Sequence, residues 1–367
     1  MRVVLFGYLG GQNLGDDAML AGLLETIPTG WDVVVLARDP AAVRVAEGLA
    51  CSVAVRPASL RSAVGALRGA DLVARVGGTS FHDEYVGERG RRMWTKYVRL
   101  GALFVVPRAL GVQVVALGIG SGRIRRRSTR LLASVALRSC SLVLARDRAS
   151  AEGLRRLAGR REVVAGADLA WLTAPSAPRD AGADGDPGDG IDVLGVSVLD
   201  LEPYVDDAGA ADRVWEELAT FVLDHPFERV ALFAFRDNEV ESDVPVAEAM
   251  AGRLRAKGVA VEVWVHGDGL DAVLAAINRC DAFVATRYHA AVFAARAGVP
   301  LAVLPYNSKL EHFAEDTALP PGALLDLADW SRPAAGPRLV TFGLASAPEA
   351  AVAVTRVRLD ALWREVA

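Results

Sequence analysis

The sequence contains little cysteine, and it lacks the short motifs that mark several large enzyme classes. Its three cysteines among 367 residues form no CxxC pair and show no metal-ligand spacing. We therefore interpret Cys51, Cys140 and Cys280 as small buried hydrophobic residues of a reducing compartment. There is no GKS or GKT phosphate loop, no HExxH and no GxSxG, and the opening GYLGGQNLGDD is not a GxGxxG fingerprint. These absences argue against nucleotide hydrolysis and hydride transfer.

A strong positive charge and a long uninterrupted hydrophobic run are also missing. The formal net charge is −4, so no basic field indicates a nucleic-acid partner. The most apolar stretch, residues 100–120, is interrupted by Pro107, Arg108 and repeated glycines, which predicts a helix end, a loop and a buried strand. Because the sequence opens on a strand-like VVLF and not on a charged-then-apolar stretch, we expect no secretory signal. We expect a soluble cytoplasmic protein, and peripheral membrane contact stays open.

Short apolar runs alternate with helical patterns along most of the chain. Near-continuous apolar strands separated by helices are typical of a parallel sheet covered on both faces. The expected strands are 3–6, 31–37, 52–56, 71–78, 112–120, 141–147 and 162–166 in the first half, and 192–199, 229–235, 259–265, 282–289 and 300–306 in the second.

A stretch rich in Ala, Pro, Gly and Asp separates the two halves. We expect an N-terminal α/β domain over 1–175, a linker over 176–190 and a C-terminal α/β domain over 191–345. The amphipathic pattern within 346–367 predicts a helix that packs back on the first domain. This organisation predicts two Rossmann-like parallel-sheet domains facing across a cleft, a GT-B-like fold. Ligands of open α/β sheets bind beyond the carboxyl ends of the strands, which places the expected site in that cleft.

The most informative strand end is ATRYHAAVFAARAGVP. Arg287 and His289 flank Tyr288 where a buried strand gives way to a helix. The amides of a helix N-terminus favour an anion, and a guanidinium adds a planar fork suited to phosphate or carboxylate. A histidine there can transfer protons near neutral pH. Both residues could instead cap loops, but we favour the functional interpretation.

Two strand ends of the first half carry further candidates. In LARDRAS we expect Asp147 to cap a helix, whereas Arg146 either is held by Asp147 or binds an anion. In RVGGTSFHDEY, two glycines allow close backbone approach to a ligand, and His82 and Asp83 follow at once. The basic run over 123–130 could bind phosphate or an anionic membrane, although we favour the solvated face of a helix.

Several segments, in the same order over residues 3–319, together resemble the polysaccharide pyruvyl transferase family. The opening is similar to the family's G-Y-x-G-x-x-N-x-G-D-E-A motif, with Asp17 in place of the usual Glu. GGTSFHD resembles its glycine-rich loop, ALGIGSG its G-I-G strand end, and LARDRAS its S-x-R-D/E-x-x-S segment. The stretch over 286–319 is similar to the family's R-L-H-A … A-G-V-P … Y-x-x-K pattern, with Tyr288 where Leu is commoner.

The resemblance implies transfer of the enolpyruvyl unit of phosphoenolpyruvate to two hydroxyls of a sugar, glycan or glycosylated metabolite. The product would be a pyruvate ketal, with release of phosphate. Phosphoenolpyruvate would be bound by Arg287, Arg146 and Lys309, with Tyr288 beside them. His289 would act as the general acid and base. The scheme needs no metal ion and no cofactor, because phosphoenolpyruvate is a co-substrate.

The two aspartates of NLGDDA then acquire candidate roles. A carboxylate at a helix start can cap free amides, accept hydrogen bonds from sugar hydroxyls, or take the proton of an attacking hydroxyl. We expect one aspartate to cap the helix and the other to face the acceptor, with Asp16 acting in catalysis. Asn13, Asp17, His82 and Asp83 complete the expected acceptor side. Since carboxylates repel phosphoenolpyruvate, the donor should bind nearer the second domain.

Two other classes of function stay open. A GT-B glycosyltransferase or a sugar-nucleotide epimerase would share the architecture, although the second domain shows no carboxylate pair with the spacing typical of ribose binding. A non-catalytic glycan-binding relative is compatible with the departure at Tyr288, whereas Arg287 and His289 argue against it. The identity of the acceptor does not follow from the sequence.

Overall fold

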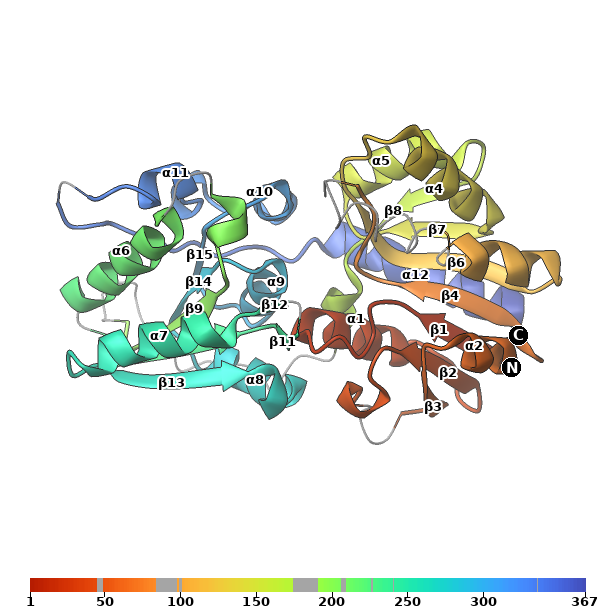
Figure 1. Ribbon diagram of the computed structural model, residues 1–367, viewed down its shortest axis with the longest axis horizontal. Helices are drawn as coiled ribbons and strands as arrows, with labels where there is room; N and C mark the ends of the chain where they lie inside the picture. The colour runs from red at the N-terminus through yellow and green to blue at the C-terminus, as the bar shows by residue number, and fades with distance from the viewer. Residues whose placement is uncertain are drawn as a thin grey trace. The chain divides into compact units, whose positions relative to one another are not determined.

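The protein consists of two compact units, each with its own parallel sheet (Figure 1). The computed structural model describes residues 1–44, 49–83, 98, 101–173, 191–205, 209–225, 227–239, 241–334 and 336–367. Unit 1 comprises Met1–Gly11, Asp16–Thr173 and Pro348–Ala367, and unit 2 comprises Gln12–Gly15 and Ala174–Ala347. The expected linker over 176–190 lies outside the described residues. Four residues of the opening motif, Gln12–Gly15, belong to unit 2.

The sheet of unit 1 has the strand order β3-β2-β1-β4-β6-β7-β8, with β5 beside β6, and all its pairings are parallel. The order reverses between β1 and β4, which makes this point the topological switch where ligands of such sheets bind. Its strands are β1 (Arg2–Phe6), β2 (Asp32–Ala37), β3 (Ser52–Pro57), β4 (Leu72–Val76), β5 (Thr79–Phe81), β6 (Gln113–Ser121), β7 (Leu142–Ala145) and β8 (Val163–Ala165).

The helices of unit 1 include the last helix of the chain. The described helices are α1 (Leu14–Leu24, whose first two residues belong to unit 2), α2 (Leu60–Leu67), α4 (Arg127–Ser139), α5 (Arg148–Ala158) and α12 (Glu349–Val366). On α12, the Trp363 ring meets Trp31 edge to face at 5.8 Å, and its Nε1 donates to the Thr26 hydroxyl at 3.3 Å. The buried Thr355 hydroxyl accepts the Ala167 N–H at 2.8 Å. These contacts attach α12 to unit 1.

The sheet of unit 2 has the order β13-β10-β9-β14-β15, again all parallel, with a reversal between β9 and β14. A separate antiparallel hairpin, β11–β12, follows β10. The strands are β9 (Val193–Val198), β10 (Arg229–Ala234), β11 (Asp237–Asn238), β12 (Glu241–Ser242), β13 (Ala260–Val265), β14 (Ala282–Ala285) and β15 (Leu301–Val303). Gly195 is required in β9, because a Cβ there would lie 2.4 Å from the Phe283 ring.

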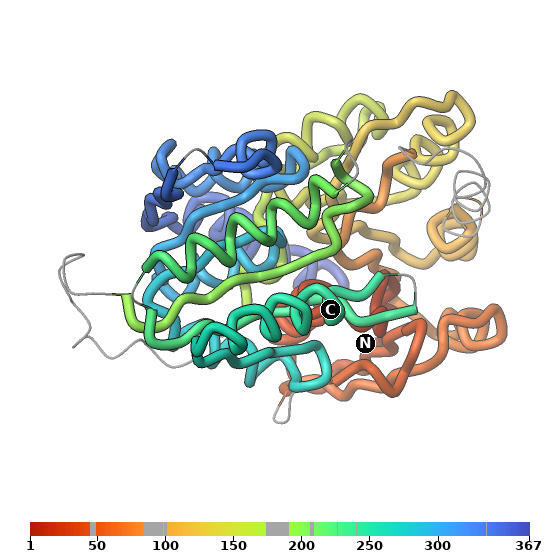
Figure 2. Tube along the Cα trace, turned by 60° about the vertical axis from the view of Figure 1, so that its left-hand side comes forward, coloured from red at the N-terminus to blue at the C-terminus, as the bar shows by residue number. Residues whose placement is uncertain are grey.

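The helices of unit 2 pack on its sheet, and α6 and α7 lie side by side (Figures 1 and 2). The described helices are α6 (Ala210–Asp224), α7 (Val244–Arg255), α8 (Leu270–Asn278), α9 (Tyr288–Arg296), α10 (Ser308–Asp316) and α11 (Leu327–Trp330). The predicted α/β class with two parallel sheets is confirmed, whereas the predicted cleft stays a prediction. The three cysteines are buried, as expected, and no disulfide joins them. Within the described ranges, no helix combines the length and apolarity needed to cross a membrane.

Candidate functional site

The junction of β14 and α9 in unit 2 carries the strongest predicted residues. The Thr286 N–H donates to Ser197 Oγ at 2.8 Å, and the Thr286 hydroxyl donates to the Ser197 carbonyl at 2.6 Å. The Arg287 N–H donates to the same Ser197 Oγ at 3.2 Å. These three bonds, two to Ser197 Oγ and one to its carbonyl, hold the chain where it leaves the sheet, and α9 begins at Tyr288. The expected strand over 282–289 was therefore too long, and His289 lies in the first turn of a helix.

The guanidinium of Arg287 is held by two carboxylates that the sequence analysis missed. Arg287 is 8% exposed, and its Nε donates to Asp243 Oδ2 at 3.1 Å while its Nη2 bonds Asp243 Oδ1. Nη2 also donates to Glu241 Oε1 at 2.9 Å. Asp243 is fully buried and accepts the backbone N–H of Arg236 as well. The sequence does show an acidic Glu-Ser-Asp stretch at 241–243, after β10, but nothing in the neighbouring sequence links it to Arg287.

The charges of this cluster shift the pKa values of its members. Burial raises the pKa of Asp243, and the neighbouring Arg287 offsets only part of that effect. Burial would also raise the pKa of Glu241, but Arg236 and Arg287 together lower it. Burial would lower the pKa of Arg287, and the opposing charge of Asp243 raises it overall. We conclude that Arg287 keeps its positive charge in a buried, anion-rich setting.

The opening motif reaches the same unit and contacts His289. The Leu14 N–H donates to the Phe235 carbonyl at 3.0 Å, and Asn13 pairs with Arg236 in an antiparallel bridge. A Cβ on Gly15 would lie only 2.0 Å from His289 Nδ1, so glycine leaves the room that the imidazole occupies. The glycine of the motif is therefore explained by the position of a predicted catalytic side chain.

The first turn of α1 contains both aspartates of the motif. The helix begins at Leu14, earlier than expected, and Asp16 and Asp17 lie inside its first turn. Asn13 precedes the helix, and its Oδ1 accepts the Gly15 N–H at 3.2 Å. Asn13 therefore fills the capping position that we expected an aspartate to take. Acidic residues in a first turn are stabilised by the positive end of the helix dipole.

A buried arginine stands beside Asp16 in unit 1, and the sequence analysis missed it. Arg75 is the one charged residue of the otherwise apolar β4 and is 6% exposed. Its Nη1 donates to the carbonyls of Phe6 and Val76 at 3.3 and 3.1 Å. Burial lowers its pKa to about 10, against the opposing effect of the Asp16 charge. A Cβ on Gly78, which has a φ of 69°, would lie 3.8 Å from Asp16 Oδ1. The same Cβ would lie 4.0 Å from Arg75 Nη2, so Asp16 and Arg75 lie near one another at the switch point between β1 and β4.

Asp83 has a structural role that its sequence context did not show. The carboxylate is buried and accepts the backbone N–H of Arg125 at 2.5 Å and that of Arg126 at 2.7 Å. Arg126 is the residue before α4 and has no cap from its own side chain. Asp83 therefore anchors the chain that leads into α4, and His82 precedes it as a partly buried residue. The expected basic helix face is only partly present, because residues 123–126 precede the helix.

We predict that Asp83→Ala lowers the free energy of unfolding by about 1.5–3 kcal/mol, because two backbone donors lose a charged acceptor. Chemical denaturation measures this loss, and the exposed Asp360→Ala on α12 serves as the matched control. Unchanged stability together with a raised KM for the expected acceptor would instead assign Asp83 to substrate binding.

Arg146 is also paired with a carboxylate. It is 5% exposed, and its Nε donates to Asp147 Oδ2 at 3.0 Å. Asp147 caps α5, as predicted, by accepting the Ser150 N–H. A Cβ on Gly120 would lie 2.8 Å from the Arg146 guanidinium, so this strand end is shaped around the arginine. A role of Arg146 in donor binding stays a prediction.

The remaining predicted donor residues lie on α9 and α10. The Tyr288 ring meets the Phe313 ring edge to face at 6.1 Å. Lys309 lies in the first turn of α10, and Asn307 caps that turn by accepting the Lys309 N–H at 3.0 Å. Among the predicted residues, unit 2 contains Asn13, Arg287, Tyr288, His289 and Lys309, and unit 1 contains Asp16, Asp17, His82, Asp83 and Arg146.

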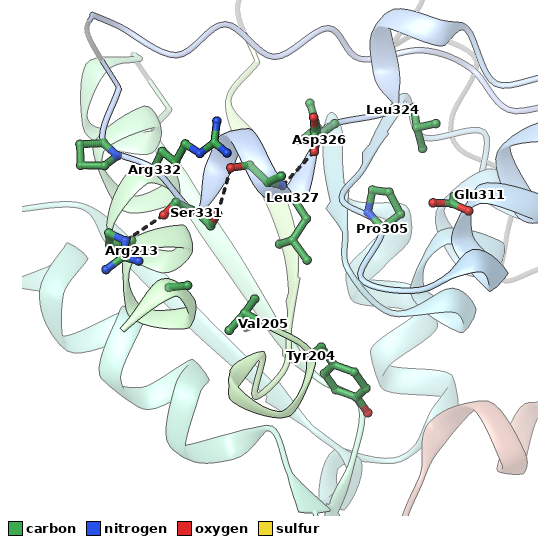
Figure 3. A pocket seen from close by; sticks show the side chains of 14 residues that line it. Tyr204, Val205, Arg213, Pro305, Glu311, Leu324, Asp326, Leu327, Ser331 and Arg332 are labelled. Atoms are coloured by element: carbon green, nitrogen blue, oxygen red, sulfur yellow. Dashed lines mark hydrogen bonds between the residues drawn. The ribbon is translucent and has the colours of Figure 1, made fainter. Parts of the chain in front are cut away.

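A cavity of about 980 Å³ lies elsewhere in unit 2, between the end of β15, the start of α6 and α11 (Figure 3). Tyr204, Pro305 and Leu327 contribute apolar surface, and Glu311 lies beside Pro305. None of the predicted site residues is among the described residues that line it. Tyr204, which lines the cavity, packs on Tyr306 with the ring centroids 4.4 Å apart.

The fold places the protein in a known structural class. Two α/β units, each with a sheet of parallel strands in the Rossmann order, are the architecture of GT-B-type sugar enzymes. UDP-GlcNAc 2-epimerase from Methanocaldococcus jannaschii is similar over 98% of this chain and 99% of its own, with a TM-score of 0.56 and 10% identity. S. aureus MnaA, whose structure was solved with UDP, is similar over 90% of this chain and 86% of its own, with a TM-score of 0.53 and 11% identity. Sucrose-phosphate synthase from Thermosynechococcus elongatus is similar over 100% of this chain and 99% of its own, with a TM-score of 0.50 and 14% identity.

The family follows from the sequence as a whole. The family model of polysaccharide pyruvyl transferase matches residues 13–308. The chain therefore belongs to the polysaccharide pyruvyl transferase family, as its ordered motifs predicted. No curated protein matches the sequence closely enough to count as a relative.

Proposed function

We propose that the protein transfers the enolpyruvyl unit of phosphoenolpyruvate to two hydroxyls of a sugar or glycan, forming a pyruvate ketal and releasing phosphate. The observation that carries this proposal is the arrangement at the β14–α9 junction. Arg287 and His289 lie together at the carboxyl end of a central strand, and the imidazole packs on Gly15 of the family's opening motif. Membership of the family supports the same reaction.

The donor would bind at the start of α9. Phosphoenolpyruvate carries a carboxylate and a phosphate, and the first turn of a helix offers free N–H groups and a positive dipole end to such anions. Arg287 places its guanidinium at this end, where Asp243 and Glu241 already pair with it. We propose Lys309 and Arg146 as further cationic ligands and Tyr288 as a neighbouring side chain.

The chemistry would proceed in two additions at one carbon. His289 donates a proton to the methylene carbon of phosphoenolpyruvate, and the first sugar hydroxyl bonds to the adjacent carbon while losing its own proton to a base. The second hydroxyl then bonds to the same carbon as the C–O bond to phosphate breaks. The proton of the second hydroxyl leaves with the phosphate. The proton that the base took from the first hydroxyl returns to His289 and restores the acid. General acid–base catalysis of this kind contributes about 10²–10⁴-fold.

Asp16 is our candidate for the base that receives the hydroxyl proton. It directly follows Gly15 in the chain, and it is 6% exposed with Arg75 beside it. Arg75 places an opposite charge beside the carboxylate of this proposed base. Asn13, Asp17, His82 and Asp83 stay candidates for binding the acceptor.

Calorimetric titration with phosphoenolpyruvate, UDP and GDP tests the donor first. We expect phosphoenolpyruvate to bind the wild type and His289→Gln, and to fail with the double variant Arg287→Met/Asp243→Asn. That pair removes the guanidinium without leaving a buried charge unpaired. His289→Gln should retain binding and lose phosphate release when a panel of sugars is added.

Nucleotide binding would give the opposite answer. Tight binding of UDP or GDP, with no response to phosphoenolpyruvate in the wild type, would overturn the proposal in favour of an enzyme that uses a nucleotide sugar. Phosphate release from phosphoenolpyruvate at equal rates in the wild type and His289→Gln would remove the role of His289.

A further inference from the structure

We propose that Glu241 is an internal anion that occupies part of the donor site on Arg287, and that phosphoenolpyruvate displaces it on binding. Glu241 would thereby determine which anions the site accepts. This inference rests on the proposed function, since it assigns Arg287 to the donor.

The two carboxylates that hold Arg287 are not equivalent. Asp243 is 0% exposed, engages both Nε and Nη2 of Arg287, and also accepts the Arg236 N–H at 3.1 Å. The Glu241 side chain is 28% exposed and reaches Arg287 through a single oxygen. It extends from β12, a two-residue strand paired with β11 alone. Asp243 is therefore a permanent partner, whereas Glu241 is attached weakly enough to be replaced.

The geometry of the Arg287 guanidinium makes a bound anion compete with Glu241 for the same nitrogen atoms. Asp243 uses the edge formed by Nε and Nη2, so a ligand that binds Arg287 in the bidentate manner must use the edge formed by Nη1 and Nη2. Glu241 accepts from Nη2 on that second edge. Among the described residues, no hydrogen bond to Arg287 Nη1 is found. An incoming carboxylate or phosphate would therefore share the edge with Glu241 or displace it.

A second arginine, Arg236, can remain the partner of the Glu241 carboxylate after its displacement from Arg287. Arg236 Nη1 already bonds Glu241 Oε2, and the Arg236 side chain is 27% exposed. Glu241 can therefore leave Arg287 and keep a charged partner near solvent. The four side chains Arg236, Glu241, Asp243 and Arg287 are neutral as a set in their ionised forms, so Arg287 has no positive charge in excess and an added anion must compete with Glu241 for it. A ligand with two anionic groups is best able to compete.

The test compares Glu241→Gln with the wild type in calorimetric titrations with phosphoenolpyruvate and with inorganic phosphate. Removing the competing charge should tighten phosphoenolpyruvate binding about fivefold or more, the fold-change that corresponds to roughly 1 kcal/mol for a partly exposed ion pair. Glu262→Gln is the matched control, because Glu262 forms an exposed pair with Arg229 in the same unit. We expect its affinity to stay within about twofold of the wild type.

The outcomes separate this inference from the proposed function. Equal or weaker phosphoenolpyruvate binding by Glu241→Gln overturns the displacement and leaves the donor assignment standing. Tighter inorganic phosphate binding by Glu241→Gln, without any phosphoenolpyruvate binding, supports the displacement and overturns the donor. Failure of both anions to bind both proteins overturns both claims.

Discussion

Gly15→Ala is expected to reduce turnover by about 10²–10⁴-fold while the protein still folds. Gly15 lies in the first turn of α1 with an ordinary helical backbone, so alanine meets no conformational obstacle there. The added methyl group would instead lie 2.0 Å from Nδ1, 2.4 Å from Cγ and 2.6 Å from Cε1 of His289. The ring must move away, and the expected loss is that of a displaced general acid. Overpacking of this kind costs about 1–3 kcal/mol of stability.

The control for Gly15→Ala is Gly252→Ala in α7 of the same unit. A Cβ on Gly252 meets nothing within 4 Å, so this variant should be active and up to about 1 kcal/mol more stable. Steady-state kinetics and thermal unfolding of both variants provide the comparison. Wild-type turnover in Gly15→Ala would show that the position of the His289 ring does not matter for the reaction.

Arg287→Met is expected to abolish phosphoenolpyruvate binding and to lower the free energy of unfolding by about 3–5 kcal/mol. The stability loss arises because Asp243 is 0% exposed and would keep a buried charge without its bidentate partner. The double variant Arg287→Met/Asp243→Asn should recover most of the stability and none of the binding. Chemical denaturation of the two single variants and the double variant yields their coupling free energy.

The stability loss of Arg287→Met should depend on pH in a defined direction. Burial already raises the pKa of Asp243, and loss of Arg287 removes the charge that opposes this effect. A carboxyl group whose pKa is raised in the folded state contributes stability below its unfolded pKa, and this contribution disappears as the pH rises through the folded value. The deficit of Arg287→Met should therefore be smaller at about pH 5 than at about pH 8. A deficit that does not change with pH would contradict a buried, unpaired Asp243.

The strands were predictable, and the central residues of the candidate site could be selected, because their signals are local. The burial of a strand is decided by its own side chains, so continuous apolar runs predicted the strands of both sheets. Strand ends in parallel sheets carry ligand sites, which singled out Arg287 and His289. The order of motifs along the chain, rather than any one of them, predicted the family.

The partners of those residues depend on contacts between distant parts of the chain. Asp243 lies 44 positions before Arg287, and the sequence around either residue does not indicate that the two form a pair. Gly15, which leaves room for the His289 ring, is one of four residues of the opening motif that belong by sequence to the first half and by contacts to unit 2. A residue's own type and its neighbours determine whether it enters a strand or a helix. Only the folded backbone determines which distant side chains share a buried site, because the charge and volume of that site are set jointly by all of them.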